Sequence, residues 1–134
     1  MTSSRRHKSR RTPPPLHELE SEVMEELWRR GESSVRTIME ALNKRARRDR
    51  AYTTYMTIMA RLHRKRLLRR RREGNTDFYE PALGRDEYME LRAASEVEAL
   101  VAEYGDVALA NFAQQMASLD PARRRALQRL ARKR

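Results

Sequence analysis

The hydrophobic period changes within residues 51–81, and this change constrains the fold more than any other feature of the chain. Apolar side chains first recur at i, i+3, i+4 and i+7, the spacing that places them on one face of an α-helix. These residues are Tyr55, Ile58, Met59 and Leu62. Two short strand candidates follow, residues 67–72 and 77–80, on either side of the turn signal Glu-Gly-Asn-Thr. We therefore expect a helix that leads directly into a β-hairpin.

Two more amphipathic segments precede this helix. Residues 16–30 carry an apolar stripe at helical spacing and end at Gly31, a residue that commonly terminates helices. A second stripe lies in residues 35–42, and either Ser33 or Ser34 can cap the start of that helix. Three helices in this order, followed by a hairpin, predict a winged helix-turn-helix.

The rest of the chain divides into regions with different residue patterns. The third helix is expected to run from about residue 51 to residue 66, and the whole winged domain to span residues 16–82. Residues 83–134 return to helical patterning, and Asp120-Pro121 is a typical start for the last helix. These helices are too short and too thinly apolar to fold alone in water, so we expect them to pair with a second copy. The predicted fold class is mainly α with a small β-hairpin, followed by C-terminal dimerisation helices.

The N-terminal residues 1–15 carry five cations, no acidic residue and three consecutive prolines. Because proline disfavours helix and favours extended backbone, we expect a disordered basic arm. Two interpretations stay open for it, contact with phosphate groups and a solvated tail.

The polar face of the third helix predicts contacts with DNA bases. It is composed of short hydroxyl side chains and one long cation: Thr53, Thr54, Thr57 and Arg61. Three threonines within five residues disfavour a helix, so another requirement favours them there. Short polar groups and a cation suit the floor of the major groove. The alternative is simple helix capping and solvent exposure.

A second group of residues predicts phosphate contacts. Eight Lys and Arg lie between Arg61 and Arg72 with no acidic residue among them. Phosphate contacts position a protein on the duplex while base contacts specify the sequence. The candidates are Tyr52, Arg64, Lys65, Arg71 and Arg72. Because side chains alternate along a strand, about two of the wing arginines at most can face DNA together. A solvated face, or packing for Tyr52, is the alternative.

Composition limits the function classes. The net charge of +11 comes from 30 Lys and Arg against 19 Asp and Glu, which favours nucleic acid as a partner, and an anionic membrane second. The absence of cysteine excludes disulfides, thiolate zinc sites and cysteine nucleophiles. No metal-ligand spacing, nucleophile–base pair or phosphate loop is present, so we expect neither an enzyme nor a cofactor, and no small-molecule ligand is evident. No apolar run approaches a membrane span or a signal peptide, and we expect a cytoplasmic protein.

The chain resembles the BlaI/MecI family of bacterial repressors, also called penicillinase repressors. The matching segments are LHELESEVMEELW (16–28), SVRTIMEAL (34–42), AYTTYMTIMARLHRK (51–65) and the wing ending FYEP (78–81). The resemblance implies a homodimeric transcriptional repressor whose recognition helix contacts an inverted repeat, typically with TACA/TGTA half-sites. The family residues that contact the bases match Thr53, Thr54 and Thr57.

The resemblance also implies a release mechanism. A membrane-bound sensor metalloprotease detects a β-lactam and triggers cleavage of the repressor at an Asn-Phe bond, which matches Asn111-Phe112. Cleavage there would weaken the dimer, and with it the avidity for two half-sites. The alternative is that Phe112 is only an aromatic residue of the dimer core.

Several positions depart from the family pattern. His17 stands where Ser or Thr usually caps the first helix, Arg66 where a glycine commonly ends the recognition helix, and Asp77 at a usually aromatic wing position. The C-terminal cysteines of the copper-responsive branch are absent, which excludes copper sensing through thiolates.

Two other function classes remain open from the sequence. One is a nucleic-acid-binding protein without sequence preference, either nucleoid-associated or RNA-binding. The other is an interaction module whose basic surface contacts an acidic protein. Excess random duplex separates the first class from a sequence-specific repressor, because the repressor resists this competitor. The interaction module predicts no DNA binding at moderate salt.

Overall fold

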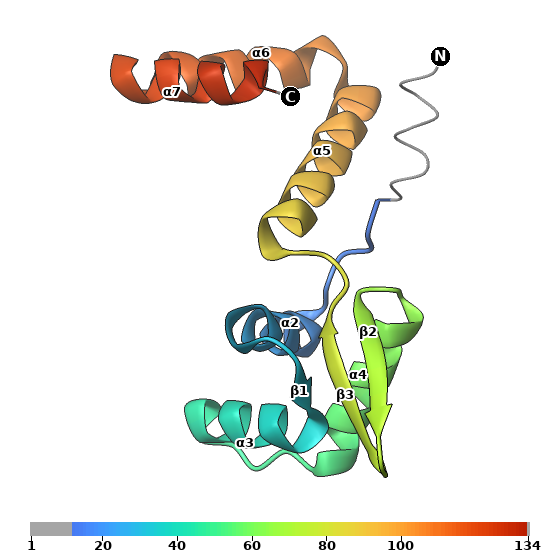
Figure 1. The fold of residues 1–134 in the computed structure, drawn as a ribbon. Helices are drawn as coiled ribbons and strands as arrows, with labels where there is room; N and C mark the ends of the chain where they lie inside the picture. The colour runs from blue at the N-terminus through green and yellow to red at the C-terminus, as the bar shows by residue number, and fades with distance from the viewer. Residues whose placement is uncertain (1–11, 134) are drawn as a thin grey trace. The chain divides into compact units, whose positions relative to one another are not determined.

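The computed structural model describes residues 12–133, and the chain forms two compact units, the first ending at Ala93 and the second beginning at Ala94 (Figure 1). The elements are α2 (Glu18–Arg30), β1 (Ser33–Ser34), α3 (Val35–Ala46), α4 (Tyr52–Arg64), β2 (Leu68–Glu73), β3 (Thr76–Pro81), α5 (Arg85–Tyr104), α6 (Asp106–Ala117) and α7 (Pro121–Arg132). The fold is mainly helical with a small antiparallel sheet, which confirms the predicted winged helix-turn-helix followed by C-terminal helices.

The sheet has three strands in the order β1-β3-β2. In the hairpin, Glu73 pairs with Thr76, so the turn consists of Gly74 and Asn75 and is shorter than the four residues expected. Gly74 has a φ of 62°, a left-handed conformation that glycine adopts without steric cost. The sequence analysis missed β1, two serines that pair with the Phe78-Tyr79 segment of β3.

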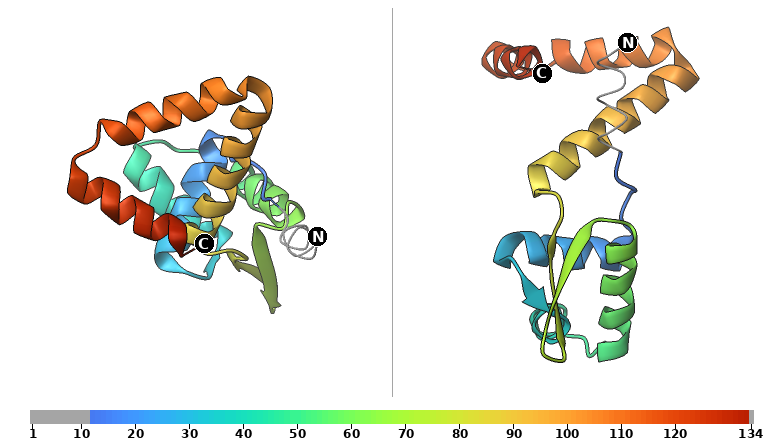
Figure 2. Two further views of the ribbon diagram at one scale, coloured as in Figure 1. Left: turned by 90° about the horizontal axis from the view of Figure 1, so that it is seen from above. Right: turned by 45° about the vertical axis from the view of Figure 1, so that its right-hand side comes forward.

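The core of the first unit lies between the three helices and the sheet. It is formed by buried apolar residues of all these elements together with Tyr88 of α5: Val23, Met24, Leu27, Val35, Ile38, Leu42, Tyr55, Ile58, Met59, Leu62, Leu67, Leu68, Tyr79 and Tyr88. The right view of Figure 2 shows α4 beside the hairpin and α3 seen almost end-on, so α3 and α4 cross steeply. The apolar stripes predicted for the helices are the faces that they bury.

The helix ends differ in detail from the expectations. Ser34, one of the two predicted caps, accepts a hydrogen bond from the backbone N–H of Thr37 at 3.2 Å. The first helix begins at Glu18 rather than residue 16, and Glu20 accepts a hydrogen bond from the backbone N–H of His17 at 3.0 Å. This bond satisfies a group at the helix start where the expected cap residue is missing.

The third helix ends at Arg64, two residues before the predicted end. Arg66 follows it with a φ of 66°, the left-handed conformation that favours glycine. An arginine therefore adopts the backbone conformation that the family usually assigns to a glycine at this position, at a modest steric cost.

Residues 1–11 of the predicted basic arm lie outside the described residues, but its last residues belong to the folded unit. The carbonyl oxygen of Pro13 accepts a hydrogen bond from Arg92 at 3.2 Å, and that of Pro14 accepts one from the Tyr88 hydroxyl at 2.9 Å. Pro13 is buried. At Pro13 and Pro14, α5 thus supplies hydrogen-bond donors for the proline carbonyls.

The second unit contains the end of α5 together with α6 and α7. As predicted, Asp120 caps α7, accepting hydrogen bonds from the backbone N–H groups of Ala122 and Arg123, and Pro121 is its first residue. Arg124 donates to the carbonyl oxygens of Met116 and Leu119, which satisfies acceptors at the end of α6. Among the described residues, no helix is long and apolar enough to cross a membrane.

Candidate nucleic-acid interface

The predicted base-contacting residues lie on the solvent side of α4. Thr53, Thr54 and Thr57 are exposed and Arg61 is half-buried, whereas the apolar residues on the opposite side are buried. Burial of one side in the core fixes which side chains the helix presents to solvent. The structure therefore places the four residues together on one exposed surface.

The first turn of α4 is held by a polar network around Asn43, at the end of α3. The Asn43 amide oxygen accepts hydrogen bonds from the Tyr55 hydroxyl at 2.8 Å and from the backbone N–H of Arg50 at 3.2 Å. Its amide nitrogen donates to the Arg50 carbonyl oxygen at 3.0 Å. The Arg50 side chain in turn lies 3.5 Å from Glu22 of α2.

Sequence reasoning missed these positioning residues. An asparagine at the end of an amphipathic helix, next to a loop, is a signal for such a bond, because its side chain readily pairs with nearby backbone. The network fixes the angle at which α3 passes into α4, and hence where the threonine face lies.

The other end of α4 is held by a buried carboxylate. Glu20 is 1% exposed and binds the ammonium group of Lys65 at 2.8 Å. Burial alone would raise the pKa of Glu20, but the hydrogen bonds from His17 and Lys65 outweigh it and leave this pKa lowered. Lys65 was predicted to contact phosphate. Its ammonium group instead closes an internal ion pair, so a phosphate contact would require this pair to break.

A second buried carboxylate connects α2 with α3. Glu26 is also 1% exposed and forms ion pairs with Arg29, Arg30 and Arg45, the last two at 2.8 Å. The cost of burial is again outweighed by hydrogen bonds, here from Arg30 and Arg45, so the pKa of Glu26 is lowered. Three cations around one carboxylate satisfy a charge that would otherwise destabilise the core.

The wing presents its predicted phosphate ligands on opposite faces. Arg71 and Arg72 are adjacent in β2, and both are exposed. Arg71 donates to both carboxylate oxygens of Glu32 at 3.0 and 3.1 Å, contacts Glu73 at 2.9 Å, and lies 4.9 Å from the centre of the Phe78 ring. Its hydrogen bonds lower the pKa of Glu32.

The remaining predicted phosphate ligands are less constrained. Arg72 pairs with Asp77 at 3.4 Å, a long contact. Arg64 is exposed in the last turn of α4 and forms no ion pair with another described residue. Tyr52 is exposed in the first turn, with the Arg36 guanidinium 5.8 Å from its ring centre. Exposed ion pairs contribute little to stability, so these cations can exchange their partners for phosphate at small cost.

Comparison with known proteins identifies the family of this chain. A family model described as "Penicillinase repressor" matches residues 16–133. The chain belongs to the penicillinase repressor family. Two curated relatives, both named "Transcriptional regulator BlaI", come from the CDC 1551 / Oshkosh and H37Rv strains of Mycobacterium tuberculosis. Each is 48% identical over 73 residues, which cover 54% of this chain and 51% of the relative, so the match spans about half the length of each relative.

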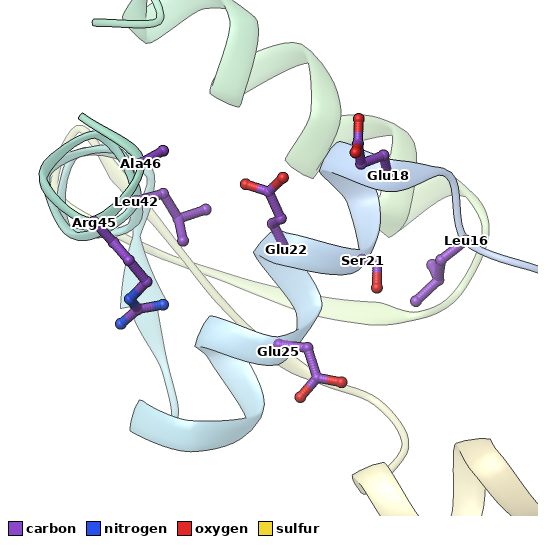
Figure 3. A pocket seen from close by; sticks show the side chains of 8 residues that line it. All are labelled: Leu16, Glu18, Ser21, Glu22, Glu25, Leu42, Arg45 and Ala46. Carbon is purple, nitrogen blue, oxygen red and sulfur yellow. The ribbon is translucent and has the colours of Figure 1, made fainter. Parts of the chain in front are cut away.

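In this penicillinase repressor family member, a hollow elsewhere on the first unit has a different chemistry. Figure 3 shows the three glutamate side chains of this hollow along α2. The hollow is lined by residues near the start of α2 and the end of α3: Leu16, Glu18, Ser21, Glu22, Glu25, Leu42, Arg45 and Ala46. Three carboxylates against one arginine would repel phosphate, so we do not assign this hollow to DNA. No group of three or more metal-binding side chains occurs in the described part of the chain.

The residues that match the family's cleavage bond lie in the second unit. Asn111 is exposed and Phe112 half-buried, both in the middle of α6. The Asn111 side chain donates to the Val107 carbonyl oxygen at 2.8 Å, one turn earlier. The bond between them is therefore helical in this structure.

Proposed function

We propose that this chain is a homodimeric, sequence-specific DNA-binding transcriptional repressor that acts in the cytoplasm. The observation that carries the proposal is the exposed threonine face of α4, held at its start by Asn43 and just beyond its end by the Glu20–Lys65 pair. A rigid helix with short polar side chains is what direct contact with base edges requires. The name of the mycobacterial relatives supports the same function.

In this proposal α4 enters the major groove of a half-site. Thr53, Thr54, Thr57 and Arg61 contact base edges, and phosphate contacts come from Tyr52, Arg64, Arg71 and Arg72. Lys65 acts as a positioning residue, because its ammonium group already binds Glu20. Arg71 and Arg72 are adjacent in β2 and face opposite ways, so each contacts a phosphate on its own side of the wing.

The second unit joins two copies in the proposed repressor. Its helices leave large apolar side chains exposed in the single chain: Val97, Leu100, Tyr104, Val107, Leu109 and Leu130. A second copy of the same helices would bury them. The two heads then bind the two halves of an inverted repeat, and the linked binding supplies avidity.

Cleavage at Asn111-Phe112 is the proposed route of release, with a membrane sensor metalloprotease as the partner. The bond lies within α6, so a protease that binds an extended segment must first unwind part of this helix. Cleavage there would separate α7 and the end of α6 from the dimerisation helices. Substitution of Asn111 or Phe112 tests this route. Repression should be preserved, and induction should be blocked.

The experiment that tests the proposed function is a gel shift on the promoter upstream of the gene itself, at about 150 mM salt with excess random duplex. Sequence-specific repression predicts a discrete band and protection of two half-sites about one helical turn apart. A smear that disappears with competitor would contradict it and favour binding without sequence preference.

A further inference from the structure

Two large apolar side chains remain exposed in residues 16–82, and both belong to the start of α4. Tyr52 is 42% exposed and Met56 44%, whereas the apolar residues on the other side of α4 are buried. Because the two residues are four positions apart, they are neighbours on the helix surface. These two exposed apolar side chains form a small patch that adjoins the threonine face.

Cations border this patch. Tyr52 and Met56 line a groove whose other walls are the start of α3, with Ser34 and Arg36, and the tip of the wing, with Arg72 and Asn75. Arg36 stacks over the Tyr52 ring, with 5.8 Å between its central carbon and the ring centre. Asp77 also lines the groove, but it is paired with Arg72 at 3.4 Å. Met56 is thus an apolar side chain that shares this groove with two arginines.

The placement of this groove suits one strand of a duplex. With α4 in the major groove and the wing outside it, one sugar-phosphate backbone of the duplex has to pass between α4 and the wing. Arg36 and Arg72 would then lie beside phosphates, and Met56, three residues after Thr53 and so its neighbour on the helix surface, would lie at the edge of the threonine face, within reach of the nearby bases. The apolar group in the major groove is the 5-methyl group of thymine.

We infer that Met56 is a specificity-determining residue that packs on the 5-methyl group of a thymine, while Arg36 contacts a phosphate of the same strand. This inference rests on the proposed function, because it requires α4 in the major groove. Hydrogen bonds from threonine hydroxyls do not detect the methyl group, whereas a flexible thioether side chain fits against it. Met56 would therefore add a preference that Thr53, Thr54 and Thr57 do not supply.

The test is a double-mutant cycle between protein and DNA. The bound sequence is first selected from a random duplex pool with the full chain, and each thymine in it is then replaced by deoxyuridine, which lacks only the methyl group. Removing one buried methyl group should weaken binding by the intact chain about fourfold at one position in each half-site. The Met56→Ala chain should bind thymine and deoxyuridine duplexes equally at that position.

Two variants serve as controls. Met89→Ala removes another exposed methionine, on α5, and should keep the fourfold penalty. Arg36→Ala should weaken binding to thymine and deoxyuridine duplexes alike and lower the slope of log affinity against log salt by about one. An unchanged slope would show that Arg36 does not contact a phosphate group.

The failures are distinguishable. If a sequence is selected but every deoxyuridine penalty persists in Met56→Ala, the assignment of Met56 is wrong while the proposed repressor function stands. If no sequence emerges from the pool, sequence-specific binding itself fails, and the inference is overturned with it.

Discussion

The two units of this chain bury their apolar residues very differently. The first unit encloses a core of fourteen apolar residues from its helices and its hairpin, including fully buried side chains such as Tyr55, Ile38 and Leu62. In the second unit the one buried apolar residue among those described is Ala108, and large side chains such as Val107 and Tyr104 are exposed. A core of the first kind can support a folded unit by itself, whereas the second unit would gain stability from the proposed association with a second copy.

The largest expected effect comes from removing α7 and the end of α6 from the second unit. A chain that ends at Asn111 should sediment as a monomer, and its affinity for a two-half-site operator should fall by about 10² or more, because the linked second contact is lost. The thermal unfolding midpoint of the first unit should stay close to that of the full chain. A truncated chain that remains dimeric would contradict the division of roles between the units.

A matched pair of leucine substitutions sharpens the same comparison. Leu62→Ala should lower the free energy of unfolding by about 3 kcal/mol, because Leu62 is fully buried. Leu109→Ala, at a residue that is 49% exposed, should cost less than about 0.5 kcal/mol in monomer stability but weaken self-association. Urea unfolding and sedimentation measure the two effects. Equal losses of unfolding free energy would show that Leu109 is as well packed as Leu62.

The buried carboxylates of the first unit predict an acid limit to its stability. The pKa of Glu26 is lower in the folded chain than its ordinary value of 4.5, so its ion pairs stabilise the fold above that pH, and this contribution is lost as the pH falls through the lowered pKa. Glu26→Gln should cost about 1–2 kcal/mol at neutral pH, since its arginine partners are partly exposed.

The same variant should show a flatter dependence of unfolding free energy on pH below 4.5. Glu25→Gln is the matched control, because Glu25 is exposed and pairs with Arg85 on the surface. It should change stability by less than about 0.5 kcal/mol. If the two variants behave alike, the Glu26 cluster contributes no more than a surface ion pair.

The smallest expected effect concerns the wing. Replacing Arg71 and Arg72 together by Ala should leave folding nearly unchanged, because both residues are exposed and their ion pairs are on the surface. Binding to operator and to random duplex should weaken alike, and the salt slope should decrease by about one to two. A salt slope equal to that of the intact chain would refute the phosphate role of the wing.

Periodicity predicted the helices of the first unit well because burial repeats with the helical turn. The stripes that contain Ile38 and Leu62 are the faces now buried in the core, and Asp120 caps α7 as expected. Strand β1 was missed because two serines carry no alternation of apolar and polar residues. It is defined only by pairing with β3, which is distant in sequence.

The threonine face could be predicted for the same reason, but the contacts that position it could not. Glu20 and Lys65 are 45 residues apart and show no periodic relation, so their pair appears only when α2 lies beside the end of α4. The sequence therefore predicts a phosphate role for Lys65 and gives no sign of its partner Glu20. The sequence predicts no role for Met56, since methionine is usually a core residue, and its exposure in the structure sets it apart.

The measurement that tests the central claim most directly compares Thr57→Val with the intact chain on the selected operator and on random duplex. Valine keeps the shape of threonine and removes its hydroxyl group, so the fold should be retained. We predict that operator affinity falls about tenfold or more while affinity for random duplex is unchanged, because the hydroxyl contacts a base edge. An equal loss on both duplexes, or no loss on either, would contradict the assignment of the threonine face of α4 to sequence recognition.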